Sequence, residues 1–273
     1  MISALLTPAP TRVMGIVNVT PDSFSDGGDH ADPGSAIAHG LRLAAEGAAI
    51  VDVGGESTRP GAERVSADEE LDRVLPVVSA LASQAVAVSI DTMRAEVAQC
   101  CVEAGAVIVN DVSGGLADPR MLATVARLGC GYIAMHWRTH SRQMDQAAHY
   151  QDVVAEVRAE LLDRVKAAVQ ARIDPERIML DPGIGFSKDS DQNWALVRAA
   201  EQFQTIGLPM LWGVSRKRFL ADVSAGAQPP QRDAASAAVT AWLAGRGVWA
   251  VRTHTVTDHL AAVAVAERLR GQP

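Results

Sequence analysis

Side chains that could bind or react with a ligand recur along the chain, each placed directly after a short apolar run. In chain order they are Asn18, Asp52, Glu56, Asp91, Asn110, Asp111, His136, Asp181, Ser215, Lys217, Arg252 and His254. Each one alone has an ordinary structural explanation, such as a helix N-cap at Asp91 or a turn at Asp181. Together they suggest a binding site, because polar groups that converge in a concave site usually hold a ligand.

Three adjacent cations, Arg216, Lys217 and Arg218, follow the seventh of these apolar runs. Lysine is otherwise rare: Lys166 and Lys188 are the two others, against 22 arginines. Positive charge at the start of a helix opposes the helix dipole, which favours anions there. A solvated basic helix start and a site for an anionic ligand are therefore equal alternatives at this stage.

A second group of cations follows the eighth run, where strand alternation places Arg252 and His254 on one side. Two cations on one side suit a phosphate or diphosphate, although packing and surface hydrogen bonds explain either residue alone. Asn18, beside an acidic loop, could share Mg²⁺ with a diphosphate, because Mg²⁺ keeps several waters and takes few protein ligands.

Other residues give weaker signals. His136 and His140 are four positions apart, but the spacing supplies no third ligand, so we expect no zinc site. Met135 and Phe186 could form a wall for a flat ring, although core packing is the simpler explanation for both.

The elements that would carry these residues alternate regularly. Short runs rich in β-branched residues predict strands at 13–19, 49–54, 86–91, 107–111, 131–136, 178–182, 209–214 and 249–254. Stretches with helical spacing lie at 34–47, 67–83, 93–104, 118–128, 151–172, 191–205, 233–246 and 256–270. Strands that are apolar throughout indicate a parallel sheet with helices outside. Eight such units predict an α/β fold, a closed (β/α)₈ TIM barrel, as a single domain over residues 1–273 with a flexible start at 1–11.

A doubly wound open sheet is the alternative fold. It needs a phosphate-binding glycine fingerprint after the first strand, and the sequence there, NVTPDSFSDGG, has none. In a barrel the strand ends meet at one mouth, so the polar residues would surround a single site. The first two strand-to-helix connections, 20–33 and 55–66, are long enough to be binding loops or lids.

The composition argues against several classes of partner. A formal charge of −7 disfavours nucleic acid, and aromatic residues at 4% are too few for stacking on single strands. The sequence has no run of 18 apolar residues that would predict a membrane span, and it begins without the basic start of a signal peptide. Three cysteines, Cys100, Cys101 and Cys130, without C-x-x-C spacing suit a reducing cytoplasm.

Seven segments resemble one known family, in order along the chain. They are MGIVNVTPDSFSDGG (14–28), DVGGESTRPGA (52–62), SIDTMR (89–94), VNDVSGG (109–115), LDPGIGFSK (180–188), GVSRKRF (213–219) and VRTH (251–254). These segments are similar to those of the dihydropteroate synthases, pterin-binding enzymes of folate biosynthesis. The resemblance implies a TIM barrel, usually a homodimer, that joins 6-hydroxymethyl-7,8-dihydropterin diphosphate to p-aminobenzoate and releases diphosphate and 7,8-dihydropteroate, with Mg²⁺ as cofactor.

The resemblance also implies roles for individual residues. Pterin-binding positions match Asp91, Asn110, Met135, Asp181, Phe186 and Lys217. The residues around p-aminobenzoate match Thr58, Arg59, Pro60, Phe186 and Ser215. The diphosphate site matches Asn18, Arg252 and His254, with Asn18 also at the metal. The implied catalytic residues are Asp22, Asp91, Lys217 and Arg252.

Two positions depart from the family pattern. Thr255 replaces the acidic residue that commonly follows His254, which could change the orientation or charge of that histidine. Trp212 stands where a small or aliphatic residue is common, and we expect it to affect barrel packing more than chemistry.

Three other functions remain open. A methyltetrahydrofolate-dependent methyltransferase domain shares the pterin-binding barrel, but it would need neither SRKRF nor the Arg252 and His254 pair. A non-catalytic pterin-binding paralogue would lose motif residues that this chain keeps. A Schiff-base aldolase could use Lys217, but it leaves the long loops and the carboxylates unexplained.

Overall fold

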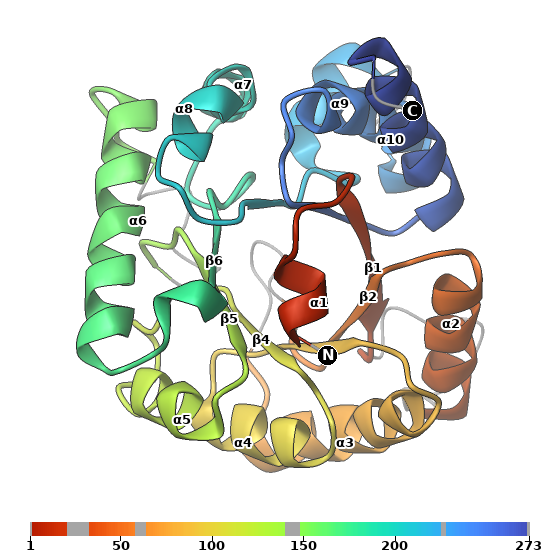
Figure 1. The fold of residues 1–273 in the computed structure, drawn as a ribbon, viewed down its shortest axis with the longest axis vertical. Coiled ribbons are helices and arrows are strands. Elements are labelled where there is room, and N and C mark those ends of the chain that lie inside the picture. The colour runs from red at the N-terminus through yellow and green to blue at the C-terminus, as the bar shows by residue number, and fades with distance from the viewer. Residues whose placement is uncertain (1, 21–32, 58–63, 140–147, 225–227, 272–273) are drawn as a thin grey trace.

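Eight parallel strands form the centre of the computed structural model, which describes residues 2–20, 33–57, 64–139, 148–224 and 228–271. The strands are β1 (Arg12–Asn18), β2 (Ile50–Gly54), β3 (Val88–Asp91), β4 (Ile108–Asp111), β5 (Gly131–Met135), β6 (Ile178–Asp181), β7 (Leu211–Trp212) and β8 (Ala250–Thr253). They pair in the order β6-β5-β4-β3-β2-β1-β8-β7, and a bridge between Leu180 and Met210 joins the two ends. The sheet therefore closes into the predicted barrel (Figure 1).

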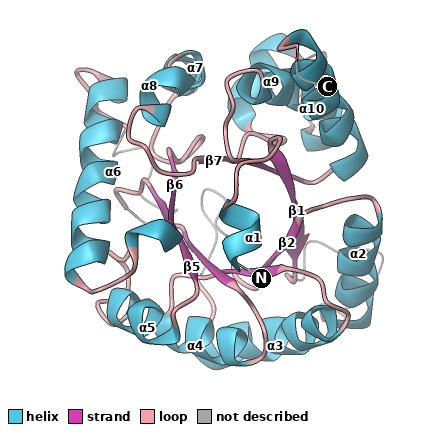
Figure 2. Cartoon of the chain, viewed as in Figure 1, coloured by secondary structure: helices cyan, strands magenta, loops and turns pink. Residues whose placement is uncertain are grey.

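Helices surround this ring, cyan around magenta in Figure 2. The α-helices after the first strand are α2 (Pro33–Ala45), α3 (Ala67–Ser83), α4 (Ala95–Glu103), α5 (Met121–Leu128), α6 (Val153–Gln170), α7 (Ser190–Arg198), α8 (Ala200–Gln204), α9 (Asp233–Ala244) and α10 (Val256–Leu269). Short 3₁₀ helices lie at η3 (Pro175–Arg177), η4 (Arg218–Val223) and η5 (Pro229–Arg232). Within the described residues, none of these helices combines the length and apolar character that a membrane span needs.

Strand alternation divides the buried side chains between two layers. Residues facing outward, such as Val53, Val109 and Trp212, pack in the large cluster between the strands and the helices. Residues facing inward form a second cluster: Met14, Ile50, Ile108, Ile133, Met179, Leu211, Trp249 and Ala250. Two residues further along several strands, the inward positions become polar, which fills one half of the barrel with packing and leaves the other half for chemistry.

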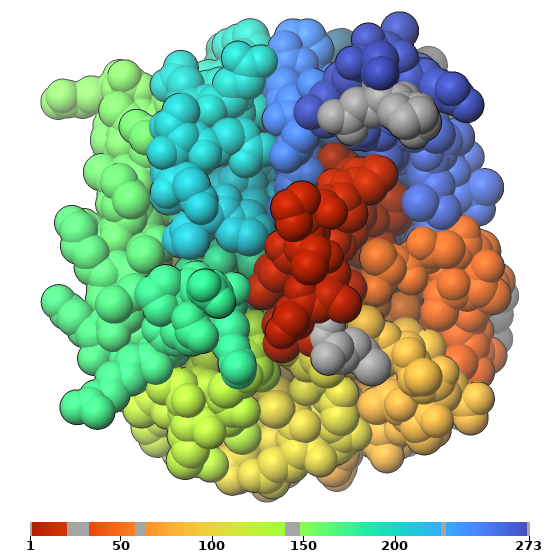
Figure 3. Space-filling view, viewed as in Figure 1, coloured from red at the N-terminus to blue at the C-terminus, as the bar shows by residue number. Residues whose placement is uncertain are grey.

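Helix α1 (Ile2–Leu6) covers the packed end of the barrel. Ile2, Leu5 and Leu6 contact the inner cluster, and Trp249 Nε1 donates a hydrogen bond to the Leu5 carbonyl at 2.8 Å. Figure 3 shows this segment in red over the centre of the ring. The structure gives residues 2–6 a helical conformation that packs against the barrel. The flexibility expected for residues 1–11 stays a prediction.

Several boundaries differ from the predicted ones for identifiable reasons. The helix expected from 118 begins at Met121, because Asp118 forms a turn in which its side chain accepts the Arg120 backbone N–H at 2.9 Å. The same carboxylate accepts the Ala95 N–H at 3.0 Å, where α4 starts two residues later than expected. The helix predicted over 191–205 is interrupted at Ala199 into α7 and α8.

The seventh strand is much shorter than the predicted 209–214. Pro209 has no N–H to donate to a neighbouring strand, although its carbonyl accepts from Leu180 at 2.9 Å. Trp212 is fully buried and meets Phe203 edge-on, with 5.7 Å between ring centroids. This residue therefore packs between the barrel and its helices, as expected.

Candidate active site

One cavity of about 1010 Å³ opens at the carboxyl ends of the strands. The site residues predicted from the sequence that line it are Asn18, Asp91, Asn110, Met135, Asp181, Phe186, Ser215, Lys217, Arg252 and His254. They come from β1 and from every strand between β3 and β8, or from the loops that follow those strands. The barrel thus brings together side chains that are up to 236 positions apart in the sequence.

The remaining predicted site residues are Asp22, Thr58, Arg59 and Pro60, together with Ser23 and Phe24 of the first long loop, and they lie outside the described residues. The described ends of the second long loop are well anchored. Glu56 accepts from Arg94 Nη1 at 2.6 Å and from Arg64 Nε at 3.0 Å. One carboxylate therefore connects the first residues of this loop to its last described residues.

Arg252 connects two carboxylates within the barrel. Its Nε donates to Asp52 Oδ2 at 2.6 Å, and its Nη2 donates to Asp91 Oδ2 at 2.8 Å. Burial raises the pKa of Asp91 to about 7; Arg252 opposes the rise and Asp52 adds to it. Asn110 Nδ2 also donates to Asp52 Oδ2, at 3.0 Å, which holds the amide in one orientation.

The sequence marks Asp52 as a polar strand end without indicating its role. This residue is fully buried at an inward position of β2, and it organises Arg252 and Asn110 without lining the cavity itself. The signal that could have found it is its place two residues after Ile50, on the inward face of the strand.

Asp181 lies at the end of β6 and is 6% exposed. Its Oδ1 accepts the Gly183 N–H at 2.7 Å, which fixes the carboxylate, while burial raises its pKa. A Cβ on Gly213 would stand 3.8 Å from Asp181 Oδ2. The glycine therefore leaves the space beside this oxygen open for a flat ligand.

Lys217 reaches across to the loop after β6. Its Nζ donates to the Ile184 carbonyl and lies 4.3 Å from the centroid of the Phe186 ring. Burial lowers the pKa of Lys217 to about 8, and the charge of Asp181 opposes this effect. Lys217 precedes the six-residue 3₁₀ helix η4, so the dipole argument made for an α-helix start has little force here.

The neighbouring Arg216 holds the turn that presents Ser215 and Lys217. It adopts a left-handed backbone conformation with φ of 61°, which is strained for a residue with a side chain. Its guanidinium donates to both carboxylate oxygens of Asp233, at 2.7 and 2.8 Å, and its N–H donates to Ser236 Oγ at 3.0 Å. Helix α9 thus fixes this turn in place.

His254 is oriented by Ser215. The Ser215 Oγ lies 3.0 Å from His254 Nδ1, and the His254 N–H donates to the same oxygen at 3.3 Å. Thr255, which departs from the family pattern, precedes α10 without a side-chain cap, and its Oγ1 makes no hydrogen bond within the described residues. The loop after β7, through Ser215, therefore orients His254 in place of an acidic residue at position 255.

Apart from Asp52, which faces into the barrel, two predicted strand-end polar groups do not converge on the cavity, contrary to the prediction. Asp111 follows Asn110 directly and therefore faces the helices, where its carboxylate accepts from Ser113 Oγ at 2.7 Å and Tyr132 Oη at 3.0 Å. His136 is 1% exposed and lies beneath the loop after β6, in contact with Lys188. Neither residue lines the cavity.

Comparison with known proteins agrees with this geometry. The pterin-binding enzyme family matches residues 14–254. The dihydropteroate synthase of Mycobacterium leprae is 51% identical over 263 residues, which cover 94% of this chain and 93% of that protein.

Two structures of the Xanthomonas albilineans dihydropteroate synthase share the fold. The structure with 4-aminobenzoic acid has a TM-score of 0.91 and 44% identity, covering 98% of this chain and 95% of that one. The complex with 7,8-dihydropteroate has a TM-score of 0.88 and 42% identity, with 98% and 96% covered. With this agreement over nearly its whole length, the chain belongs to the dihydropteroate synthase family of pterin-binding enzymes.

Proposed function

We propose that this chain joins 6-hydroxymethyl-7,8-dihydropterin diphosphate to p-aminobenzoate, forming 7,8-dihydropteroate and diphosphate. The observation that carries this proposal is the set of side chains around one cavity. Two carboxylates and an amide, from Asp91, Asp181 and Asn110, share it with the cations of Lys217 and Arg252. This is the combination that a substrate with a hydrogen-bonding ring and an anionic tail requires.

The pterin ring presents a flat, guanidine-like edge of donors beside an acceptor oxygen. Asp181 can accept from the exocyclic amine and the ring N–H, and Asn110 supplies an amide for the same edge. Leaving either polar edge unpaired in a dry pocket would cost about 1–3 kcal/mol per group, so these side chains select for the pterin.

The reaction breaks the bond between the pterin methylene carbon and the diphosphate oxygen, which keeps the electron pair. Negative charge grows on the leaving oxygens, and we assign its stabilisation to Arg252, His254 and Asn18, which line the same cavity. Asp91 lies beside Arg252 and could share positive charge that develops on the pterin methylene and ring.

The second substrate forms the new bond. The arylamine nitrogen of p-aminobenzoate attacks the methylene carbon and then loses a proton; because an arylamine is already nucleophilic at neutral pH, no strong base is needed. We place its ring against Phe186, near Ser215 and the Lys217 ammonium. By the family resemblance, Thr58, Arg59 and Pro60 would contact p-aminobenzoate, and Asp22 would take part in catalysis.

Mg²⁺ fits this arrangement as an ion that arrives with the diphosphate. In the described part of the chain, no three His, Cys, Asp or Glu side chains are grouped to hold a metal by themselves. Asn18 nevertheless offers a hard amide oxygen in the cavity, and Mg²⁺ commonly combines few protein ligands with waters and substrate phosphates. When bound, Mg²⁺ would neutralise charge on the diphosphate.

The test is a turnover assay with the diphosphate pterin and p-aminobenzoate, with and without Mg²⁺. We expect 7,8-dihydropteroate and diphosphate in equal amounts, and we expect Lys217→Ala to abolish their formation. Absence of product with the wild-type chain would reject the proposed reaction, and near-normal turnover by Lys217→Ala would reject the role of this lysine. Methyl transfer from methyltetrahydrofolate in the same preparation would favour the methyltransferase alternative.

We further propose a homodimer in the cytoplasm. The family resemblance supports the dimer, as do large apolar side chains exposed on η4, α9 and α10, namely Val223, Trp242 and Val265. The three cysteines are free, two of them buried, which suits a reducing compartment. Sedimentation equilibrium should give twice the 28.8 kDa chain mass, and a single-chain mass would reject the dimer.

A further inference from the structure

A buried lysine that lines the cavity, but is not among the predicted site residues, holds the loop that follows β6. Lys188 is 7% exposed, and its Nζ contacts three acceptors: the Gly183 carbonyl at 2.9 Å, the Phe186 carbonyl at 2.8 Å and His136 Nδ1 at 3.0 Å. An ammonium has three N–H donors, so this set satisfies all of them. Burial lowers the pKa of Lys188 to about 7; the charge of Asp181 opposes this effect, and the charges of Lys217 and Arg138 add to it.

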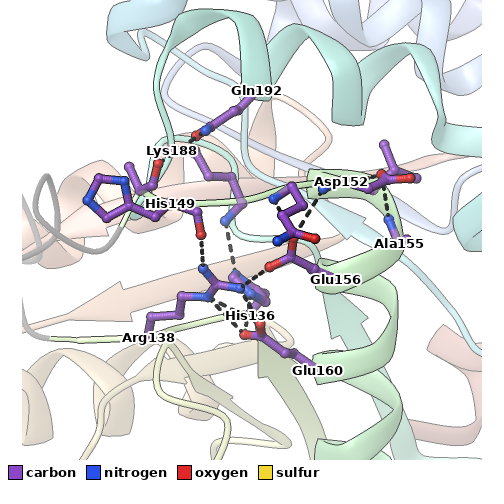
Figure 4. Close-up of polar contacts among 12 residues, drawn as sticks. His136, Arg138, His149, Asp152, Ala155, Glu156, Glu160, Lys188 and Gln192 are labelled. Carbon is purple, nitrogen blue, oxygen red and sulfur yellow. Dashed lines mark hydrogen bonds and ion pairs between the residues drawn. The ribbon is translucent and has the colours of Figure 1, made fainter.

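The contact with Lys188 determines the state of His136. Since Nδ1 accepts from the ammonium, Nε2 carries the ring proton and donates it to Glu160 Oε2 at 2.8 Å. Burial and the charge of Lys188 lower the pKa of His136 to about 4, so the ring is neutral near pH 7. Figure 4 shows the ring between the lysine and the carboxylate.

Helix α6 supplies the outer end of this chain of contacts. Although burial acts in the opposite direction, hydrogen bonds from His136 and Arg138 lower the pKa of Glu160 to about 2. Arg138 donates to Glu160 and, at 3.0 Å, to Glu156, and its guanidinium carbon lies 3.8 Å from the centroid of the Tyr150 ring. Glu160 and Arg138 therefore hold in place the His136 ring that Lys188 contacts (Figure 4).

The loop held by Lys188 packs too closely for side chains at two of its glycines. Gly183 has φ of 69°, and a Cβ there would stand 2.4 Å from the His136 carbonyl oxygen. Gly185 has φ of 80°, and its Cβ would stand 2.7 Å from Lys217 Cδ. The loop thus packs against the His136 backbone on one side and against the Lys217 side chain on the other.

We infer that Lys188 is a positioning residue for the arylamine step: by binding the Gly183 and Phe186 carbonyls, it fixes the loop that sets the Phe186 ring and the Ile184 carbonyl against Lys217. The inference rests on the proposed function, because it requires p-aminobenzoate to lie between Phe186 and Lys217. The hydrogen-bonding edge of the pterin is instead assigned to Asp91, Asn110 and Asp181, at the ends of strands, so the pterin depends less than p-aminobenzoate on this loop even though Phe186 and Lys217 also match pterin-binding positions. Loss of Lys188 should therefore affect the two substrates unequally.

The experiment compares Lys188→Met with the wild-type chain in steady-state kinetics. Met keeps the approximate length of the side chain but has no donor for either carbonyl. We expect kcat/KM for p-aminobenzoate to fall by about ten- to a hundredfold, while the Kd of the diphosphate pterin, measured by calorimetry without the second substrate, changes less than about twofold. Lys166→Met, at an exposed lysine on α6, should leave both values unchanged.

A milder pair of variants covers the case in which Lys188→Met does not fold. Glu160 and Glu156 both pair with Arg138 and have similar side-chain exposures of 38% and 35%, but Glu160 alone of the two contacts His136. Glu160→Leu should raise the KM for p-aminobenzoate by about three- to tenfold, and Glu156→Leu should not change it.

Two results would overturn the inference. One is unchanged p-aminobenzoate kinetics in folded Lys188→Met or in Glu160→Leu. The other is an equal loss for pterin binding and for p-aminobenzoate, which would give Lys188 a merely structural role. If the wild-type chain makes no dihydropteroate, the proposed function fails first, so the two failures are distinguishable.

Discussion

Arg252 donates hydrogen bonds to two carboxylates, Asp52 and Asp91. Although burial works against its charge, Asp52 and Asp91 raise its pKa, so the guanidinium stays protonated. If the diphosphate binds as proposed, it shares this cation with Asp91, whose pKa burial raises to about 7. The proposed anion and the Asp91 carboxylate would therefore compete for one side chain.

The first prediction concerns this cation. Arg252→Ala should weaken binding of the diphosphate pterin by about 10–100-fold, the size of a lost charge-assisted contact, and should affect the same pterin without its diphosphate far less. Isothermal calorimetry with both ligands measures the difference. Equal losses for the two ligands would remove Arg252 from the anion site.

This variant needs a stability control, because Asp52 is fully buried and would lose its counter-ion. The double variant Arg252→Ala with Asp52→Asn should recover the thermal midpoint, since the amide needs no cation. It should not recover affinity for the diphosphate. Recovery of both would show that Arg252 acts only by stabilising the barrel.

The second prediction is a narrow pH optimum. The proposed reaction uses ionised Asp91, which predominates above its pKa of about 7. It also uses protonated Lys217, which predominates below its pKa of about 8. The kcat/KM for the diphosphate pterin should therefore rise through about pH 7 and fall through about pH 8. Lys217→Arg should move the alkaline limb upward. An alkaline limb that stays in place in this variant would contradict the assignment.

At the scale of elements, helices α9 and α10 are joined by a buried polar contact. Thr240 Oγ1 lies 2.8 Å from His259 Nδ1, and His259 is fully buried. Burial lowers the pKa of His259 to about 4. An unfolded histidine titrates near 6.5, so between about pH 6.5 and 4 the unfolded chain binds a proton that the folded chain does not, and stability falls as the pH falls.

The third prediction is that His259→Asn reduces this acid sensitivity. The amide can still pair with Thr240 but does not titrate. Between pH 7 and pH 5 the free energy of unfolding should fall by about 1–2 kcal/mol less in the variant than in the wild type, as measured by urea denaturation. His136 keeps part of the slope in both proteins. Identical slopes would mean that His259 takes up its proton without unfolding.

The elements themselves were predictable wherever periodic patterns extended over many residues, and less so where single side chains decide a boundary. The carboxylate of Asp118 sets where both α4 and α5 start, and no local pattern reveals that it reaches Ala95. The same distinction between local patterns and long-range contacts applies to the site. Strand ends and family motifs pointed to Asp181 and Lys217, whereas the role of Asp52 depends on Arg252, 200 positions away, and that of Lys188 on contacts between separate loops.

At the scale of the molecule, the two ends of the barrel are specialised, one for packing and the other for chemistry. Helix α1 seals the packed end through Ile2, Leu5 and Leu6, and the Trp249 indole is tied to its backbone. Its removal should affect folding much more than catalysis, because the cavity opens at the opposite end of the strands.

The fourth prediction is that deleting residues 2–7 lowers the free energy of unfolding by about 2–4 kcal/mol, the value of a few partly buried aliphatic side chains, and leaves both KM values within about twofold. Leu5→Asp should reproduce much of the loss, whereas Ser3→Asp, at an exposed position of the same helix, should not. A large rise in either KM would show that the two ends are coupled.

The number of main-chain contacts between neighbouring strands differs around the barrel. Paired residues extend over five positions between β1 and β2, but the described contact between β6 and β7 consists of the Leu180 and Met210 bridge and the bond from Leu180 to Pro209. The loops that carry Phe186 and Lys217 leave from the two sides of this junction. Widening the ring there breaks the fewest main-chain bonds and separates those two side chains. The spacing between Phe186 and Lys217 is therefore set where the fewest main-chain bonds hold the ring together.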